Sequence, residues 1–191
     1  MPSRLPKPSS IYQIKITLRD SRPPVWRRIR VRDDITLAEL HKDLQAVMGW
    51  TDTHLHQFVI GDKHYGVPDE EEEIGFSKTE DESKYKLGDL VLRENSQVGY
   101  DYDFGDNWEH VLLVEKILPP QQDMRSPVCL AGARACPPED VGGIGGYEDF
   151  LKALGDPHHP AHKEFLEWIG GEFDPEAFDV DEVNEILREM T

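Results

Sequence analysis

The chain has 191 residues, of which 38% are hydrophobic and 31% charged, and its formal net charge is −17. This composition suffices for one hydrophobic core with a small helical addition, and no apolar run reaches the roughly 18 residues of a membrane-spanning helix. The acidity excludes broad attraction to phosphate backbones, because duplex affinity depends on neutralising phosphates.

The first ten residues have prolines where a secretory signal would need an apolar core. We therefore expect a disordered lead-in over residues 1–10, one domain over residues 11–191, and a soluble cytoplasmic protein without a membrane partner. Cys129 and Cys136 are the only cysteines. Two cysteines are too few for a disulfide framework, so we expect reduced, buried thiols.

The first third of the chain predicts a hairpin and a helix. Alternation from Ile11 to Arg19 and apolar residues from Val25 to Val31 indicate two paired strands. Thr36 and Glu39 have the spacing of a capping box, which opens a helix that ends at Gly49. Its expected apolar stripe consists of Leu37, Leu40, Leu44, Val47 and Met48.

Further strands are expected over residues 54–60 and 63–65, followed by an acidic surface excursion from residue 69 to 86 and a short strand or turn at 87–92. Residues 100–118 alternate around Gly105-Asp106-Asn107, which predicts a hairpin. We expect Phe104 and Trp108 to be largely buried.

Beyond residue 119 the composition changes. The run Gly142–Gly146 predicts irregular backbone, and helices are expected over residues 147–154, 160–169 and from Asp179 onward. The last helix has the apolar face Val183, Ile186, Leu187 and Met190. The pattern as a whole predicts an α+β fold with a mostly antiparallel sheet of β-grasp (ubiquitin-like) type. Residues 11–118 would form the sheet with one helix, and residues 119–191 a loop and a helical extension.

The segment from Tyr100 to His110 concentrates aromatic, acidic and imidazole side chains at the predicted hairpin tip. Histidine and carboxylate groups together suit a divalent metal such as zinc or manganese. The candidate metal or ligand site consists of His54, His56, Asp103, Asp106 and His110. A second candidate is His158 with His162, one helical turn apart. Ordinary roles are the alternative: strand histidines are often half-buried, and a turn aspartate usually bonds its own backbone.

Two other segments carry functional hypotheses. Glu139 and Asp140 precede a glycine-rich loop, which either closes over a ligand or forms a rigid bend. The only dense basic strip, Arg27, Arg28, Arg30 and Arg32, is the one place where nucleic acid would bind. The favoured interpretation is a solvent-facing strand whose arginines pair with acidic residues.

Four motifs occur in a fixed order: residues 54–58, 102–110, 136–143 and 173–175. Together they resemble the plasmid pRiA open-reading-frame-three (ORF-three-like) family, from about Ile11 to the C-terminus. The resemblance implies a plasmid or mobile-element setting. The family has no established activity, although some members carry a resolvase label. The cysteine that the family often has before its double glycine is Val141 here.

Resolvase chemistry does not fit these residues. A serine recombinase needs a nucleophilic serine among arginines and a basic DNA-binding helix pair. Here Ser9 and Ser10 stand in a proline-rich lead-in, and the C-terminal helices are acidic. The sequence therefore favours a non-catalytic binding or interaction module; it does not identify the partner, for which another protein is one candidate. A metal-dependent hydrolase is the alternative, and weak nucleic-acid binding ranks below both.

Overall fold

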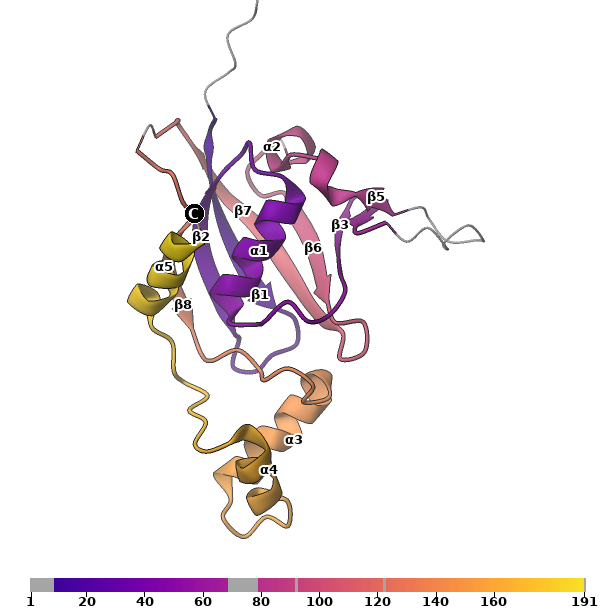
Figure 1. Cartoon of the computed structure of the whole chain (residues 1–191), viewed down its shortest axis with the longest axis vertical. Helices are drawn as coiled ribbons and strands as arrows, with labels where there is room; N and C mark the ends of the chain where they lie inside the picture. The colour runs from indigo at the N-terminus through magenta and orange to yellow at the C-terminus, as the bar shows by residue number, and fades with distance from the viewer. Residues whose placement is uncertain (1–8, 69–78, 92, 122, 191) are drawn as a thin grey trace, which may run out of the picture.

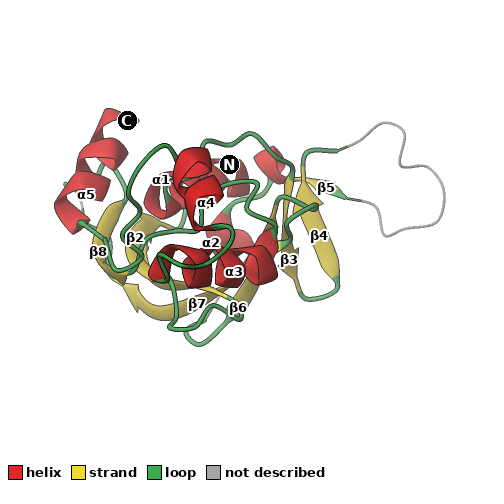
Figure 2. Ribbon diagram, turned by 90° about the horizontal axis from the view of Figure 1, so that it is seen from below, coloured by secondary structure: helices red, strands yellow, loops and turns green. Residues whose placement is uncertain are grey.

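The computed structural model describes residues 9–68, 79–91, 93–121 and 123–190, and it shows one large sheet with helices gathered on one side (Figures 1 and 2). The predicted lead-in lies outside the described residues except for Ser9 and Ser10, and so does most of the acidic excursion, residues 69–78. No helix in the described ranges is long and apolar enough to cross a membrane.

The sheet has eight strands in the order β5-β4-β3-β6-β7-β1-β2-β8, and all neighbouring pairs are antiparallel except β4 with β5. The strands are β1 (Ile11–Leu18), β2 (Trp26–Arg32), β3 (His56–Ile60), β4 (Lys63–Gly66), β5 (Glu80–Asp81), β6 (Gln97–Tyr102), β7 (Trp108–Leu118) and β8 (Val128–Ala133).

The α+β class and the mostly antiparallel sheet are as expected, but the β-grasp arrangement is wrong. In a ubiquitin-like sheet the first strand runs parallel to the strand inserted beside it. Here β1 pairs antiparallel with β7, from Ile11 opposite Leu118 to Leu18 opposite His110. The parallel pair, β4 with β5, lies at the sheet edge. The order hairpin, helix, strands cannot settle this, because only about two-thirds of consecutive strands are neighbours in a sheet.

Helix α1 (Leu37–Met48) crosses the inner face of the sheet (Figure 1). The predicted capping box is present: the Thr36 hydroxyl accepts the Glu39 N–H at 3.1 Å, and the Glu39 carboxylate accepts the Thr36 N–H at 2.7 Å. The helix ends at Gly49, whose φ of +92° favours glycine. Every residue of the predicted stripe is at most 3% exposed: Leu37, Leu40, Leu44, Val47 and Met48.

The hairpin of β6 and β7 is confirmed, and Trp108 is fully buried on its inner face. Phe104, in contrast, is 52% exposed. Asp103 has a φ of +56°, which turns the backbone out of the strand before Phe104. Phe104 therefore belongs to the turn and does not share the strand alternation that predicted its burial.

After β7 the chain contributes β8, which the sequence analysis did not predict. β8 pairs with β2 and forms one edge of the sheet. Helix α5 (Val180–Glu189) covers this edge, where the Asn184 side chain bonds both the N–H and the C=O of Cys129, at 2.8 and 2.9 Å. The Asn184 amide thus makes the hydrogen bonds that a further strand would make with Cys129, and this part of the β8 edge is not free to pair with another chain.

The last helix begins as predicted, because the Asp179 carboxylate accepts the Asp181 N–H at 2.8 Å. Its apolar face is only partly buried. Leu187 is 1% exposed, whereas Ile186 and Met190 are 41% and 49% exposed.

The glycine run departs from its prediction, since α3 (Gly143–Gly155) includes most of it. A Cβ on Gly143 would lie 2.4 Å from the Asp106 carbonyl oxygen, and one on Gly146 would lie 2.0 Å from the Val141 carbonyl oxygen. These glycines permit close backbone contact rather than irregular structure. The one-turn helix α2 (Leu87–Leu90) occupies the segment where a short strand or turn was expected, and the 3-10 turn η1 (Glu82–Lys84) lies in the expected surface excursion.

Helices α3 and α4 (His162–Ile169) form a lobe beside the hairpin end of the sheet (Figure 1). Phe150 of α3 holds the lobe together, with ring centroids 5.3 Å from Phe165, 5.8 Å from Trp168 and 5.2 Å from Phe173. Phe173 begins the fourth sequence motif, which therefore packs the lobe.

Candidate metal centre

Three segments that are distant in sequence meet at one end of the sheet: the loop after α1, the tip between β6 and β7, and the loop before α3. The Asp103 N–H donates to the Leu55 carbonyl at 2.8 Å, and the Gly142 N–H donates to the Asp106 carboxylate at 3.0 Å. The Trp50 indole N–H donates to the Pro137 carbonyl at 3.0 Å. Three of the four sequence motifs thus converge on one place.

His54, Asp103 and Asp140 form the centre of this junction. The His54 Nε2 atom lies 3.3 Å from a carboxylate oxygen of Asp140 and 3.7 Å from one of Asp103. One ligand atom from each residue lies within 4.8 Å of the other two. Nε2 is itself buried and makes no hydrogen bond, so its contact with Asp140 has the distance of an ion pair without hydrogen-bond geometry.

The centre is open on one side. The side chains of His54 and Asp103 are 27% and 10% exposed, whereas that of Asp140 is 73% exposed. An ion held between the three residues would therefore keep positions accessible to solvent.

The hairpin tip fixes the Asp103 carboxylate. One of its oxygens accepts the Gly105 N–H at 2.9 Å and the Asp106 N–H at 3.3 Å, and the other faces His54. Asp103 and Asp140 both have left-handed backbone, with φ of +56° and +61°. Aspartate adopts this conformation more readily than most residues other than glycine, which permits the tight turns that carry both carboxylates.

Glu139 anchors the loop that carries Asp140. Its carboxylate accepts hydrogen bonds from the hydroxyls of Tyr102 at 2.6 Å, Thr51 at 2.5 Å and Thr53 at 3.3 Å. Burial acts to raise the pKa of Glu139, but these hydrogen bonds outweigh it and leave the pKa below its usual value. Of the two loop candidates, Glu139 holds the loop in place and Asp140 faces the centre.

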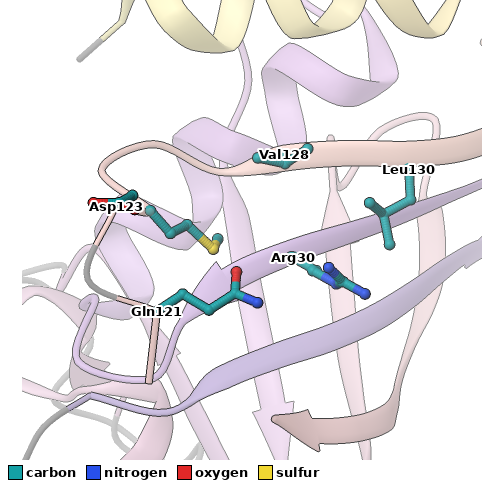
Figure 3. Close-up of a pocket in the computed structure, with 6 residues that line it drawn as sticks. Arg30, Gln121, Asp123, Val128 and Leu130 are labelled. Carbon is teal, nitrogen blue, oxygen red and sulfur yellow. The ribbon is translucent and has the colours of Figure 1, made fainter. Parts of the chain in front are cut away.

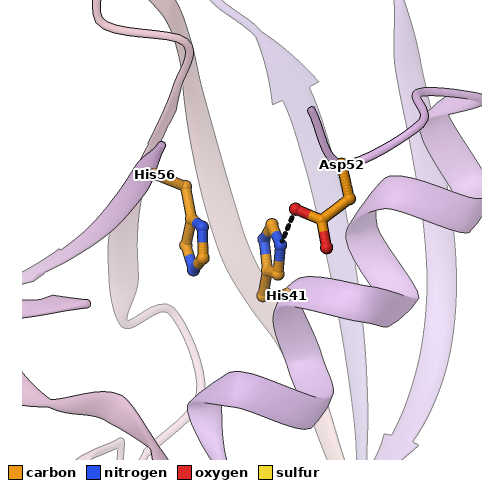
Figure 4. A group of neighbouring side chains, drawn as sticks. All are labelled: His41, Asp52 and His56. Carbon is orange, nitrogen blue, oxygen red and sulfur yellow. Dashed lines mark hydrogen bonds and ion pairs between the residues drawn. The ribbon is translucent and has the colours of Figure 1, made fainter. Parts of the chain in front are cut away.

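A second cluster joins His56 to His41 of α1 and to Asp52 (Figure 4). The two imidazole rings stack with centroids 3.4 Å apart and planes 3° from parallel. His41 bonds Asp52 at 2.8 Å through Nε2, and His56 bonds Glu82 at 2.8 Å through Nε2. Burial and the neighbouring His56 lower the pKa of His41.

The stacking disfavours one ion shared by both rings of this second cluster. A metal ion lies close to the plane of the imidazole that binds it, at about 2.0–2.1 Å from the nitrogen. Two nearly parallel rings that stack with centroids 3.4 Å apart cannot both have one ion in their planes. The cluster is therefore a hydrogen-bonded pair of imidazole–carboxylate units, and the His54 centre has the better geometry for metal.

His41 and Glu82 were missed by the sequence analysis. His41 lies four residues after Leu37 and three before Leu44, so its place on the buried stripe of α1 was a usable signal. Nothing local marks Glu82, which is only 5% exposed although it follows an acidic stretch.

The structure places the other predicted ligands, Asp106 and His110, in different surroundings. Asp106 bonds the glycine loop, as described above, and His110 is 1% exposed among the rings of Trp50 and Tyr100. His110 Nδ1 bonds the Tyr100 carbonyl at 3.2 Å, and burial lowers the pKa of His110 to about 4. The predicted set of five ligands is therefore not one site: only His54 and Asp103 stay together.

The second candidate pair is also separated from these clusters. His162 Nδ1 bonds the Ala153 carbonyl at 2.8 Å, and His158 is exposed with its N–H on the Asp156 carboxylate. Neither residue belongs to a metal-competent group within the described part of the chain.

The basic strip is split between the two faces of β2. Arg27 is 3% exposed on the inner face, where it donates to the carbonyls of Val47 and Ala133. On the outer face, Arg28 makes two bonds with Glu115 and Arg32 makes two with Asp34. Arg28 and Arg32 therefore follow the solvent-facing interpretation, whereas Arg27 is buried and Arg30 has no carboxylate partner in the ranges that the structure describes.

These features define an α+β protein with a histidine–carboxylate centre at one end of its sheet. Residues 10–182 match the family described as plasmid pRiA4b ORF-3-like protein, and the chain belongs to this family, as its four motifs predicted. The uncharacterized protein y4hQ of Sinorhizobium fredii (strain NBRC 101917 / NGR234) is 39% identical over 184 residues, which cover 95% of this chain and 93% of that protein.

A solved structure shares the fold. The crystal structure of a protein of unknown function, MM3350 from Methanosarcina mazei Go1, has a TM-score of 0.81 and 38% sequence identity. The match covers 92% of this chain and 98% of that chain.

Proposed function

We propose that the protein binds one divalent transition-metal ion between His54, Asp103 and Asp140 and uses it for hydrolysis. The observation that carries the proposal is the buried, unbonded Nε2 atom of His54 between two carboxylates. One imidazole and two carboxylates suit zinc or manganese. Catalytic sites of this kind commonly have three protein ligands and an open position, at which the ion lowers the pKa of a bound water.

The three ligands come from segments that other bonds already hold. The turn around Asp103 fixes one carboxylate, and Glu139 fixes the loop of the other. Hydrogen bonds that orient ligands in this way raise metal affinity. A preformed site also binds at a smaller cost in conformational entropy.

Metal titration of the full chain tests the proposal. Elemental analysis after equilibrium dialysis with zinc or manganese should give about one ion per chain, and the melting temperature should rise because the ion binds only the folded state. Asp103→Asn retains an acceptor for the turn N–H groups. Asp103→Asn and His54→Gln, each made alone, should abolish both the bound ion and the rise in melting temperature. His158→Gln, which changes an exposed histidine outside the centre, should leave both effects intact.

Binding that persists in His54→Gln and Asp103→Asn would place the ion elsewhere and end the proposal. The same holds if neither metal binds the wild-type chain. Metal-dependent cleavage of a generic ester, such as bis-(p-nitrophenyl) phosphate, should follow the same variant pattern.

A non-catalytic interaction module is the second candidate. Leu55, Val67 and Phe104 are 66%, 65% and 52% exposed, and all three line a pocket of about 290 Å³. Exposed apolar groups gathered around one hollow are typical of contact surfaces for another protein. Turnover that requires the metal would exclude this candidate.

A further inference from the structure

A pocket on the outer face of the sheet includes Arg30 of β2. Arg30 alternates along β2 with Ile29 and Val31, which are buried on the α1 side. Its pocket has a volume of about 480 Å³, within the usual range for small-molecule sites. Figure 3 shows the pocket, which is lined by Arg30, Gln121, Asp123, Met124, Val128 and Leu130.

Arg30 differs from its neighbours on β2 in its bonding. Arg28 and Arg32 each form two bonds with a carboxylate. Within the described ranges, Arg30 has only the Gln13 amide oxygen at 3.5 Å, and its buried Nε atom has no partner. Among the outer-face arginines of β2, Arg30 thus differs from Arg28 and Arg32 in having no carboxylate partner in the described part of the chain. Its N–H donors form a fork that matches a carboxylate.

The other residues that line the pocket favour a ligand with an apolar part next to the group that binds the Arg30 guanidinium. Val128 and Leu130 of β8 are 38% and 36% exposed toward solvent, and Met124 lies beside them. The Gln121 amide extends toward the same space as Arg30, whereas the Asp123 carboxylate points away from Arg30 (Figure 3). The pocket therefore combines one cationic fork, one amide and an apolar wall.

We infer that this pocket binds a small organic carboxylate that has an alkyl or aryl body. The carboxylate accepts hydrogen bonds from Arg30, and the body covers Met124, Val128 and Leu130. This inference does not depend on the metal centre, because no residue is shared between the two sites.

Hexanoate is the probe for the test, with the full chain labelled at its methionine and leucine methyl groups for NMR titration. Hexanoate should shift the Met124 and Leu130 methyl signals in a saturable way. Hexanol, which has the same alkyl chain without the charge, should bind about tenfold more weakly or worse, because a charged acceptor strengthens the hydrogen bonds.

Arg30→Gln should weaken hexanoate binding by about tenfold or more, and Arg30→Lys, which retains the charge without the fork, should also weaken it. Arg28→Gln is the matched control, since it removes an arginine of the same strand and face that already has a carboxylate partner, and it should leave binding unchanged. Methyl spectra confirm that each variant is folded. The inference is overturned if hexanoate causes no shift, if hexanol binds equally well, or if both Arg30 variants bind as the wild type does.

Discussion

Trp108 and Phe104 are four residues apart in one hairpin, yet their surroundings are opposite. Trp108 is fully buried against Trp50, whereas Phe104 is 52% exposed in the turn. Trp108→Ala should therefore lower the free energy of unfolding by about 3–5 kcal/mol, the usual cost of emptying a large buried ring. Phe104→Ala should change it by about 0.5 kcal/mol. Urea unfolding measures both, and equal losses would contradict the burial described here.

His110 predicts how acid affects stability. Burial lowers its pKa from 6.5 to about 4 in the folded state, so the unfolded chain takes up the proton first as the pH falls. The free energy of unfolding is therefore highest above pH 6.5, where His110 is neutral in both states, and it falls progressively between pH 6.5 and about 4. A shift of this size corresponds to about 3 kcal/mol.

His110→Phe, which has a ring that does not titrate, should flatten the loss of stability over this pH window. His158→Gln, a change at an exposed histidine, should leave it as steep as in the wild type. Denaturant midpoints measured from pH 7.5 to 4 make the comparison, and an unchanged slope in His110→Phe would count against the assignment.

At the scale of elements, the start of α3 locks the loop of Asp140 onto the hairpin tip. Gly143 has a φ of +67°, and a Cβ there would meet the Asp106 carbonyl oxygen at 2.4 Å. Gly143→Ala should thus destabilise the fold by at least about 1–2 kcal/mol, since left-handed backbone alone has this cost. Gly145→Ala has open space around its Cβ and should stabilise α3 by about 0.5–1 kcal/mol. Thermal unfolding compares the two, and the same sign for both would refute this role of Gly143.

The candidate metal centre depends on the same contact. Asp140 lies only three residues before Gly143, on the loop that Glu139 and the Asp106 carboxylate hold. A displaced glycine turn would move Asp140 away from His54. The strand pairing beneath the tip, where Tyr102 lies opposite both His56 and Trp108, supplies the rigid base.

At the scale of the whole molecule, the functional hypotheses rest on long-range contacts. The centre draws one ligand from the chain before β3, one from the hairpin tip and one from the loop before α3. The net charge of −17 adds to this arrangement, because an acidic molecule attracts cations to its exposed carboxylates. On the outer face, Arg30 has the Gln13 amide oxygen at 3.5 Å and no carboxylate partner among the described residues.

The sequence by itself determined several local elements and the family. The first hairpin, the capped helix α1, the β6–β7 hairpin and the start of α5 all follow from periodicity, capping and turn residues that lie close together in the chain. The four motifs identified the family for a related reason, since each is a short contiguous run. The division into a lead-in over residues 1–10 and one domain over residues 11–191 stays a prediction.

Only the tertiary structure decided how these pieces combine. Periodicity placed His54 and His56 together, but β3 begins only at His56 and the two side chains join different clusters, and Asp140 joins His54 from a distant loop. The pairing of β1 with β7 and the edge position of β8 have the same origin. Each depends on which distant segments become neighbours, and this is set by the packing of the whole core around α1, whereas periodicity and capping report only residues within a few positions of one another.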